Sequence, residues 1–187
     1  EHLTLIETRT GLNDLLDRRR RGDNVVGALL GTEGSHALDG KLENIDRLYA
    51  AGFRMMGLQH FFDNRLGGSL HGESQTGLTA FGEEAVRTMH ARGIMIDVAH
   101  SSEATVRDTL RVTGGGALIV SHTGFNGHCP SPRNISDETM AMITEAGGLI
   151  GVGFWSDVVC GDGINAIVSA IRYGVDRFGL EHIALGS

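Results

Sequence analysis

Short apolar segments alternate with amphipathic segments along most of the chain. The apolar runs, rich in aliphatic residues, lie at 25–30, 53–58, 94–99, 117–120 and 149–154, and another begins at 183–185. Between successive runs, apolar residues recur at helical spacing, as at 42–49 and 79–92. Buried strands that alternate with helices are typical of an α/β protein with a parallel sheet. The pattern therefore predicts five complete strands and the start of a sixth, each separated from the next by a helix.

The segment 94–122 shows this pattern most clearly. It contains two aliphatic runs, each followed by a histidine, His100 and His122. Ser102 can cap a helix between the runs, and the glycines at 114–116 can end it. In a right-handed crossover both strands run the same way, so both imidazoles reach the carboxyl edge of the sheet. A metal ion could lie between them.

Two further polar residues follow strands in the same way. Glu33 lies in a Gly-rich turn after the run at 25–30, and His60 follows the run at 53–58. Barrel enzymes place catalytic residues at this end of their strands. The GxGxxG fingerprint of a doubly wound dinucleotide-binding sheet is absent. We therefore expect a (β/α)8 TIM barrel that is incomplete in this chain, with about strands two to six and the start of strand seven.

Composition and charge narrow the classes of function. The 187 residues are 41% hydrophobic and 21% charged, as in an ordinary soluble domain. A formal net charge of -7 argues against a nucleic-acid partner, and no apolar run approaches the ~20 residues of a transmembrane segment. Two cysteines, Cys129 and Cys160, do not make a disulfide framework. They favour a reducing compartment, most simply the cytoplasm, and leave an exported or membrane-anchored parent open.

The side chains after the strands together predict a metal site. One carboxylate and three imidazoles around one opening suit Zn²⁺, with Mn²⁺ or Co²⁺ as possible substitutes. A carboxylate can also bridge two ions, and a two-metal site that holds a hydroxide can hydrolyse an amide. Arg133, in the loop CPSPRN, is either a solvated surface residue or a bidentate clamp on a substrate carboxylate. Asp97 is expected to bond backbone or to orient a neighbouring ligand, and His71 in the long loop 61–77 is treated as incidental.

Five motifs surround the candidate residues: GTEGSHAL at Glu33, RMMGLQHFFDN at His60, GIMIDVAHSS at His100, VSHTGFNG at His122 and SPRNISDE at Arg133. In order and spacing they resemble the membrane dipeptidases of the renal dipeptidase type, which are dinuclear zinc peptidases on a (β/α)8 barrel. The resemblance implies that Glu33 bridges two Zn²⁺ per complete site and that His100 and His122 complete one zinc site. It also implies that His60 contacts substrate and can stabilise the oxyanion, and that Arg133 binds the substrate's carboxylate.

The activity implied by the resemblance is that of a zinc-dependent dipeptidase, which hydrolyses the peptide bond of dipeptides by a metal-held hydroxide. Glu33 and His60 would be its catalytic residues, and a homodimer is possible. The family's His-x-Asp pair ahead of Glu33 and its Asp in a GSDFDG-like turn are absent. We therefore expect residues 1–187 to be a single metal-dependent hydrolase barrel domain truncated at both ends. The alternatives are a metal hydrolase of lactones or cyclic amides, and a catalytically inactive fragment or scaffold.

Overall fold

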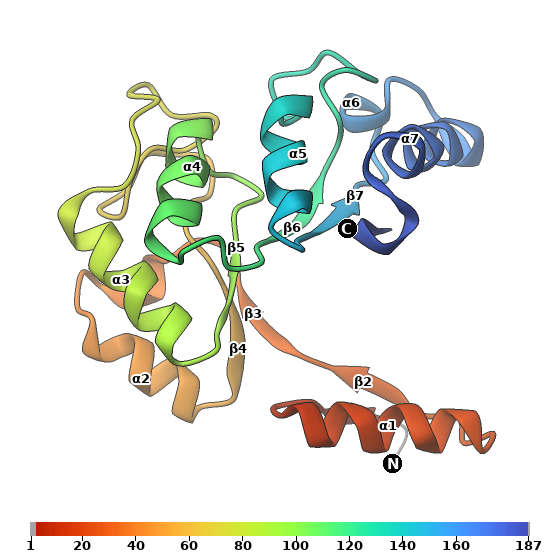
Figure 1. Ribbon diagram of the computed structural model, residues 1–187, viewed down its shortest axis with the longest axis horizontal. Coiled ribbons are helices and arrows are strands. Elements are labelled where there is room, and N and C mark those ends of the chain that lie inside the picture. The colour runs from red at the N-terminus through yellow and green to blue at the C-terminus, as the bar shows by residue number, and fades with distance from the viewer. Residues whose placement is uncertain (1–2, 187) are drawn as a thin grey trace.

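A twisted parallel sheet flanked by helices forms the main body of the computed structural model, which describes residues 3–186 (Figure 1). Its strands are β3 (Leu30–Thr32), β4 (Phe53–Gly57), β5 (Met95–Asp97), β6 (Ile119–Thr123), β7 (Leu149–Val152) and β8 (Ile183–Leu185). They are neighbours in that order, and every pair is parallel. Sequential parallel strands joined by helices make an incomplete (β/α)8 barrel, so the predicted fold class is confirmed.

The connecting helices cover one face of this sheet. They are α2 (Glu43–Ala50), α3 (Ala80–Ala91), α4 (Glu103–Val112), α5 (Asp137–Glu145) and α7 (Gly163–Phe178). The side chains of Thr79, Ser102 and Ser136 cap α3, α4 and α5 by each accepting a backbone N–H from three residues ahead. Apolar side chains from these helices join those of the strands in one continuous core. Three shorter helical segments lie between these strands and helices: η1 (His36–Leu38), α6 (Ser156–Val159) and η2 (Leu180–His182).

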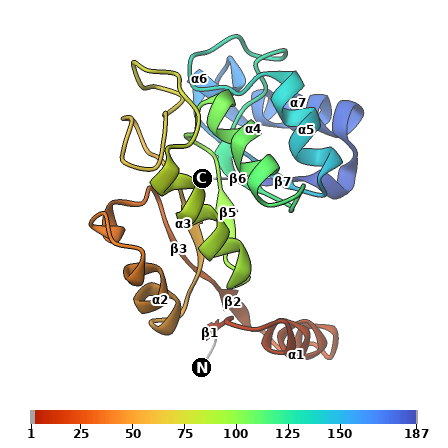
Figure 2. The same ribbon diagram turned by 60° about the vertical axis from the view of Figure 1, so that its left-hand side comes forward.

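A small N-terminal unit extends from the main sheet (Figures 1 and 2). It consists of β1 (Leu3–Leu5), α1 (Arg9–Arg20) and β2 (Val26–Ala28), with β1 and β2 paired in parallel. Ile6, Leu15 and Val25 form its separate core. The single strand predicted over 25–30 is wrong, because the chain there divides between β2, which pairs with β1, and β3, which pairs with β4. The three residues of β1 are too few to show a period in the sequence.

The register of the sheet aligns the two candidate metal ligands. Asp97 of β5 lies opposite Ile119 of β6, and His100 and His122 each come three residues later. The register then shifts between Val120 and Thr123, which is a bulge in β6 relative to β7. Both imidazoles therefore lie at the carboxyl edge of the sheet, and His122 belongs to the strand instead of following it.

Cys129 and Cys160 form a disulfide between the loop after β6 and the end of α6. The sequence analysis did not predict this crosslink. The two residues, 31 positions apart, meet because β6 and β7 are neighbours, which the spacing alone does not reveal. Disulfides persist mainly in oxidising compartments, so the predicted reducing compartment loses its support. None of the helices within residues 3–186 combines the length and apolarity that a bilayer span requires.

Candidate metal centre and substrate pocket

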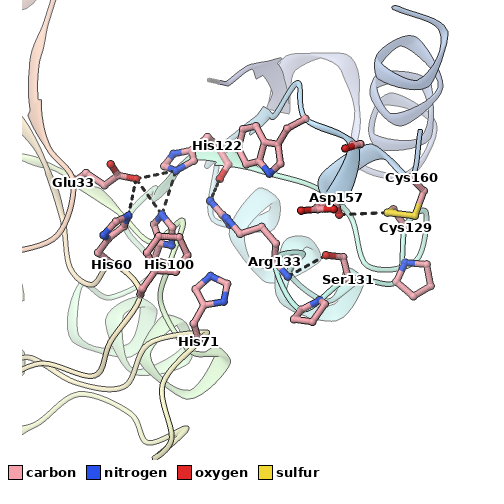
Figure 3. Close-up of a pocket in the computed structure, with 15 residues that line it drawn as sticks. Glu33, His60, His71, His100, His122, Cys129, Ser131, Arg133, Asp157 and Cys160 are labelled. Atoms are coloured by element: carbon pink, nitrogen blue, oxygen red, sulfur yellow. Dashed lines mark hydrogen bonds and ion pairs between the residues drawn. A yellow bond between two sulfur atoms is a disulfide. The ribbon is translucent and has the colours of Figure 1, made fainter. Parts of the chain in front are cut away.

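One pocket collects the residues at the carboxyl ends of β3 to β6 (Figure 3). Its volume, about 730 Å³, lies within the range of roughly 300–1,000 Å³ found for small-molecule sites. The lining residues include Glu33, His60, Phe61, His71, His100, His122, Arg133 and Trp155. All five residues predicted to form the site therefore border the same cavity.

Glu33, His100 and His122 form a triangle of potential ligand atoms. Glu33 Oε1 lies 3.0 Å from His122 Nε2 and 3.1 Å from His100 Nε2, and the two nitrogens are 3.2 Å apart. A tetrahedral zinc ion with ligand bonds of about 2.0 Å requires ligand atoms about 3.3 Å apart. The triangle thus fits three corners of a zinc site and leaves the fourth corner to the pocket.

The position of Glu33 suits a bridging carboxylate. The residue follows β3 directly, and Gly34, at a φ of 76°, turns the backbone immediately after it. Oε1 faces the histidines, including His60 Nε2 at 3.5 Å. The ion pairs with the three histidines are all shortest at Oε1, and within residues 3–186 no hydrogen bond reaches Oε2. The second oxygen therefore remains available to another cation.

The electrostatic environment favours the protonation states that bind a metal. Burial, followed by the positive charge of Arg133, lowers the pKa of His100 to about 3. The same two causes lower the pKa of His122. Burial raises the pKa of Glu33, but the hydrogen bond with His100 and the neighbouring imidazoles outweigh it, so the net pKa is lowered. Two neutral imidazoles and one carboxylate at neutral pH are what a metal site requires.

His71 is a pocket residue that the sequence analysis missed. Its ring centroid lies 5.1 Å from that of Phe61 and 5.6 Å from that of His100. Its Nε2 is buried and has no hydrogen-bond partner in the part of the chain that the structure describes. Burial lowers the pKa of His71. The loop that carries it has no hydrophobic period, so the only available signal was its place after β4, at the edge where the ligands gather.

Arg133 is buried and fixed to the strand ends that carry the ligands. Its Nη1 donates to the carbonyl oxygen of Ala99 at 3.0 Å. Its Nη2 donates to the carbonyl oxygen of His122 at 2.6 Å (Figure 3). Nη1 also makes a long hydrogen bond of 3.4 Å to Thr123 Oγ1. These contacts occupy three of the five guanidinium N–H groups. Within residues 3–186 the N–H of Nε and one N–H of Nη2 have no acceptor. Because the side chain is buried, a solvated surface role does not describe this residue.

Breaking the disulfide on the pocket wall is expected to destabilise the protein. Cys129 and Cys160 both line the pocket, and Cys129 lies four positions before Arg133. A crosslink across 31 residues stabilises a fold by about 3–4 kcal/mol through the entropy of the unfolded chain. The double substitution of both cysteines by serine should lower the unfolding free energy by that amount in urea titrations. An unchanged unfolding free energy would mean that other contacts hold this loop.

Comparison with known proteins gives a family match over almost the whole chain. The model of the family described as "Membrane dipeptidase (Peptidase family M19)" matches residues 2–187. An uncharacterized protein encoded in the pqqA 5' region of Klebsiella pneumoniae is 31% identical over 182 residues, which are 90% of this chain and 67% of that protein. An uncharacterized dipeptidase of Schizosaccharomyces pombe is 30% identical over 176 residues, which are 89% of this chain and 42% of that protein.

A solved structure shares the fold. It is a metallopeptidase from Rhodobacter sphaeroides, bound to a phosphinate mimic of the dipeptide L-Ala-D-Ala. The two superpose with a TM-score of 0.81 at 23% sequence identity, over 100% of this chain and 55% of that one. The chain thus spans about half of the length of the solved protein and less than half of the fission-yeast relative.

Proposed function

The chain belongs to the membrane dipeptidase family, peptidase family M19, and we propose that it carries the metal site and substrate pocket of a zinc-dependent dipeptidase. One observation supports this most directly. A triangle of ligand atoms with the dimensions of a zinc site shares a pocket with a buried arginine that keeps two N–H groups without an acceptor among residues 3–186. The names of the fission-yeast relative and of the Rhodobacter metallopeptidase agree with this activity.

Glu33, His100 and His122 would hold the metal, and the free Oε2 of Glu33 would bridge to a second ion. When bound, the metal lowers the pKa of a coordinated water and polarises the scissile carbonyl. His60 lies beside this centre, with its ring 4.6 Å from that of His100, and could donate a hydrogen bond to the oxyanion that develops during hydrolysis.

Arg133 would select short peptides. Its remaining N–H groups, on Nε and Nη2, can bind both oxygens of a carboxylate. Since the same pocket holds the metal triangle, the bound carboxylate must lie close to the scissile bond. A dipeptide meets this condition, because its C-terminal carboxylate is one residue away from its only peptide bond. Trp155 and Phe61 provide apolar walls for the side chains.

The disulfide supports an oxidising compartment for the protein, in place of the cytoplasm that the cysteine count favours. Export is thus the better proposal. The homodimer implied by the family resemblance stays a prediction.

Hydrolysis assays on the complete protein test the activity. We expect zinc-loaded protein to hydrolyse free dipeptides, to lose this activity in a chelator, and to regain it when zinc is restored. The C-terminal amides of the same dipeptides serve as controls for the carboxylate requirement, and tripeptides serve as controls for the distance between the carboxylate and the scissile bond. Turnover of lactones or cyclic amides without turnover of dipeptides would replace the proposal by the second alternative. The absence of any turnover, with zinc bound, would favour a scaffold.

A further inference from the structure

We infer that Asp97 and Ser121 form a hydrogen-bonded chain that fixes His122 in the tautomer able to bind a metal. The inference rests on the metal site of the proposed function and assigns positioning roles to two residues outside the ligand set. Ser121 Oγ lies 2.5 Å from Asp97 Oδ2 and 2.8 Å from His122 Nδ1. The chain therefore runs from a buried carboxyl group, through one hydroxyl, to the side of the imidazole that faces away from Glu33.

The bulge in β6 makes this chain possible. Consecutive side chains of a regular strand point to opposite faces of a sheet, so a serine would not meet the ring of the next residue. Between Val120 and Thr123, however, the register of β6 shifts against β7, and Ser121 and His122 lie within this shift. Bulges beside active sites commonly redirect a side chain in this way. The irregularity of β6 thus brings the hydroxyl to the imidazole.

The direction of the hydrogen bonds follows from the surroundings of Asp97. Oδ1 accepts the backbone N–H groups of Ala99 at 3.1 Å and Ser121 at 3.0 Å, and Oδ2 accepts the hydroxyl of Ser121. Burial raises the pKa of Asp97, while these hydrogen bonds from Ser121 and Ala99 lower it. We assign Asp97 the ionised form, which can only accept, so the single hydroxyl proton points to Asp97. The serine oxygen must then accept from Nδ1–H of His122. Nε2 consequently keeps its lone pair and directs it at the triangle with Glu33 and His100.

His100 provides a contrast within the same site. Its Nδ1 is buried and finds no hydrogen-bond partner within residues 3–186, so no comparable chain fixes its tautomer there. Outer hydrogen bonds that set the tautomer of a ligating histidine typically contribute 10–100-fold to metal affinity. We therefore expect outer hydrogen bonds to raise the metal affinity of this site through His122 and not through His100.

Asp97→Asn should reverse the chain without removing it. The two backbone N–H groups at Oδ1 require an acceptor, so they retain the amide oxygen of Asn at that place. The amide nitrogen must then face Ser121 and donate to its oxygen. The hydroxyl would donate to Nδ1, and His122 would carry its proton on Nε2, where a metal cannot bind. Ser121→Ala, in contrast, removes the hydrogen bond at Nδ1, so that His122 can adopt either tautomer.

The test measures tautomer and zinc affinity in the complete protein. Nitrogen-15 NMR of histidine-labelled, metal-free wild type should show His122 protonated at Nδ1, and Asp97→Asn should show it protonated at Nε2. Competition with a chromogenic chelator should show zinc binding about 10–100-fold weaker in Ser121→Ala, and weaker still in Asp97→Asn. Ser121→Thr, which keeps the hydroxyl, should restore most of the affinity.

Ser101→Ala is the matched control. Ser101 is a buried serine next to the other histidine ligand, but its hydroxyl donates to Gln59 Oε1 instead of an imidazole. This variant should lose stability without losing zinc affinity. An Nε2–H tautomer in wild type, or equal zinc affinities in Ser121→Ala and wild type, would overturn the inference. The NMR measurement needs neither substrate nor turnover, so it separates this failure from a failure of the proposed dipeptidase activity.

Discussion

Replacing Glu33 by Gln is expected to abolish zinc binding between His100 and His122, and dipeptide hydrolysis with it. The substitution keeps the shape of the side chain but exchanges the anionic oxygen that lies 3.0 and 3.1 Å from the two imidazole nitrogens. A neutral amide binds Zn²⁺ poorly, and it cannot bridge two cations as a carboxylate can. We expect the loss of affinity to exceed the 10–100-fold that removal of an outer partner typically costs.

The measurement is metal content by plasma mass spectrometry after dialysis of the complete protein. Wild type should retain about two zinc ions per chain, and Glu33→Gln should retain fewer than one. Glu43→Gln, which makes the same chemical change at an exposed position in the first turn of α2, should behave as wild type. Full zinc content in Glu33→Gln would show that the metal is held elsewhere and would remove Glu33 from its proposed role.

The sequence predicts the position of this site because of the geometry of parallel strands. Glu33, His60, His100 and His122 each follow or end one of four consecutive aliphatic runs. Since parallel strands share one carboxyl edge, residues that each lie at the end of a strand come close together in space. The fold class follows from the same alternation of strands and helices, which depends on local spacing alone and needs no knowledge of distant contacts.

Features that depend on contacts between loops cannot be predicted from the spacing of residues along the chain. Cys129 and Cys160 meet because β6 and β7 are neighbours in the sheet, and no spacing rule links them. His71 reaches the pocket from a loop without periodicity. The bulge that brings Ser121 to His122 is a shift in the register of β6 against β7, and it cannot be predicted from the sequence of β6 alone. The residues that support the ligands are therefore harder to predict than the ligands.

Arg133 has one proposed role that the sequence suggests and one set of contacts that it does not. Its place in a loop after β6 suggests a carboxylate clamp from the sequence, but its attachment to the carbonyl groups of Ala99 and His122 does not follow from any motif. Arg133→Ala would leave both carbonyls without this partner, at about 1–3 kcal/mol each, and would loosen the strand ends that carry the metal ligands. A fall in activity of this variant would therefore have two causes, weaker substrate binding and a loosened metal site.

Arg133→Lys separates the two roles when a free dipeptide is compared with its C-terminal amide, because lysine cannot bind a carboxylate through two parallel N–H groups and only the free dipeptide has a carboxylate. Loss of a bidentate, charge-assisted contact worth about 2–4 kcal/mol should reduce kcat/KM for a free dipeptide by roughly 30–1,000-fold, mainly through KM. The C-terminal amide of the same dipeptide lacks the carboxylate, so its poor turnover should change little between wild type and variant.

Equal losses of kcat/KM for the free dipeptide and its amide would contradict the role of Arg133 as a carboxylate clamp. They would leave Arg133 with the single role of holding the carbonyls of Ala99 and His122, and the preference for dipeptides would need another cause.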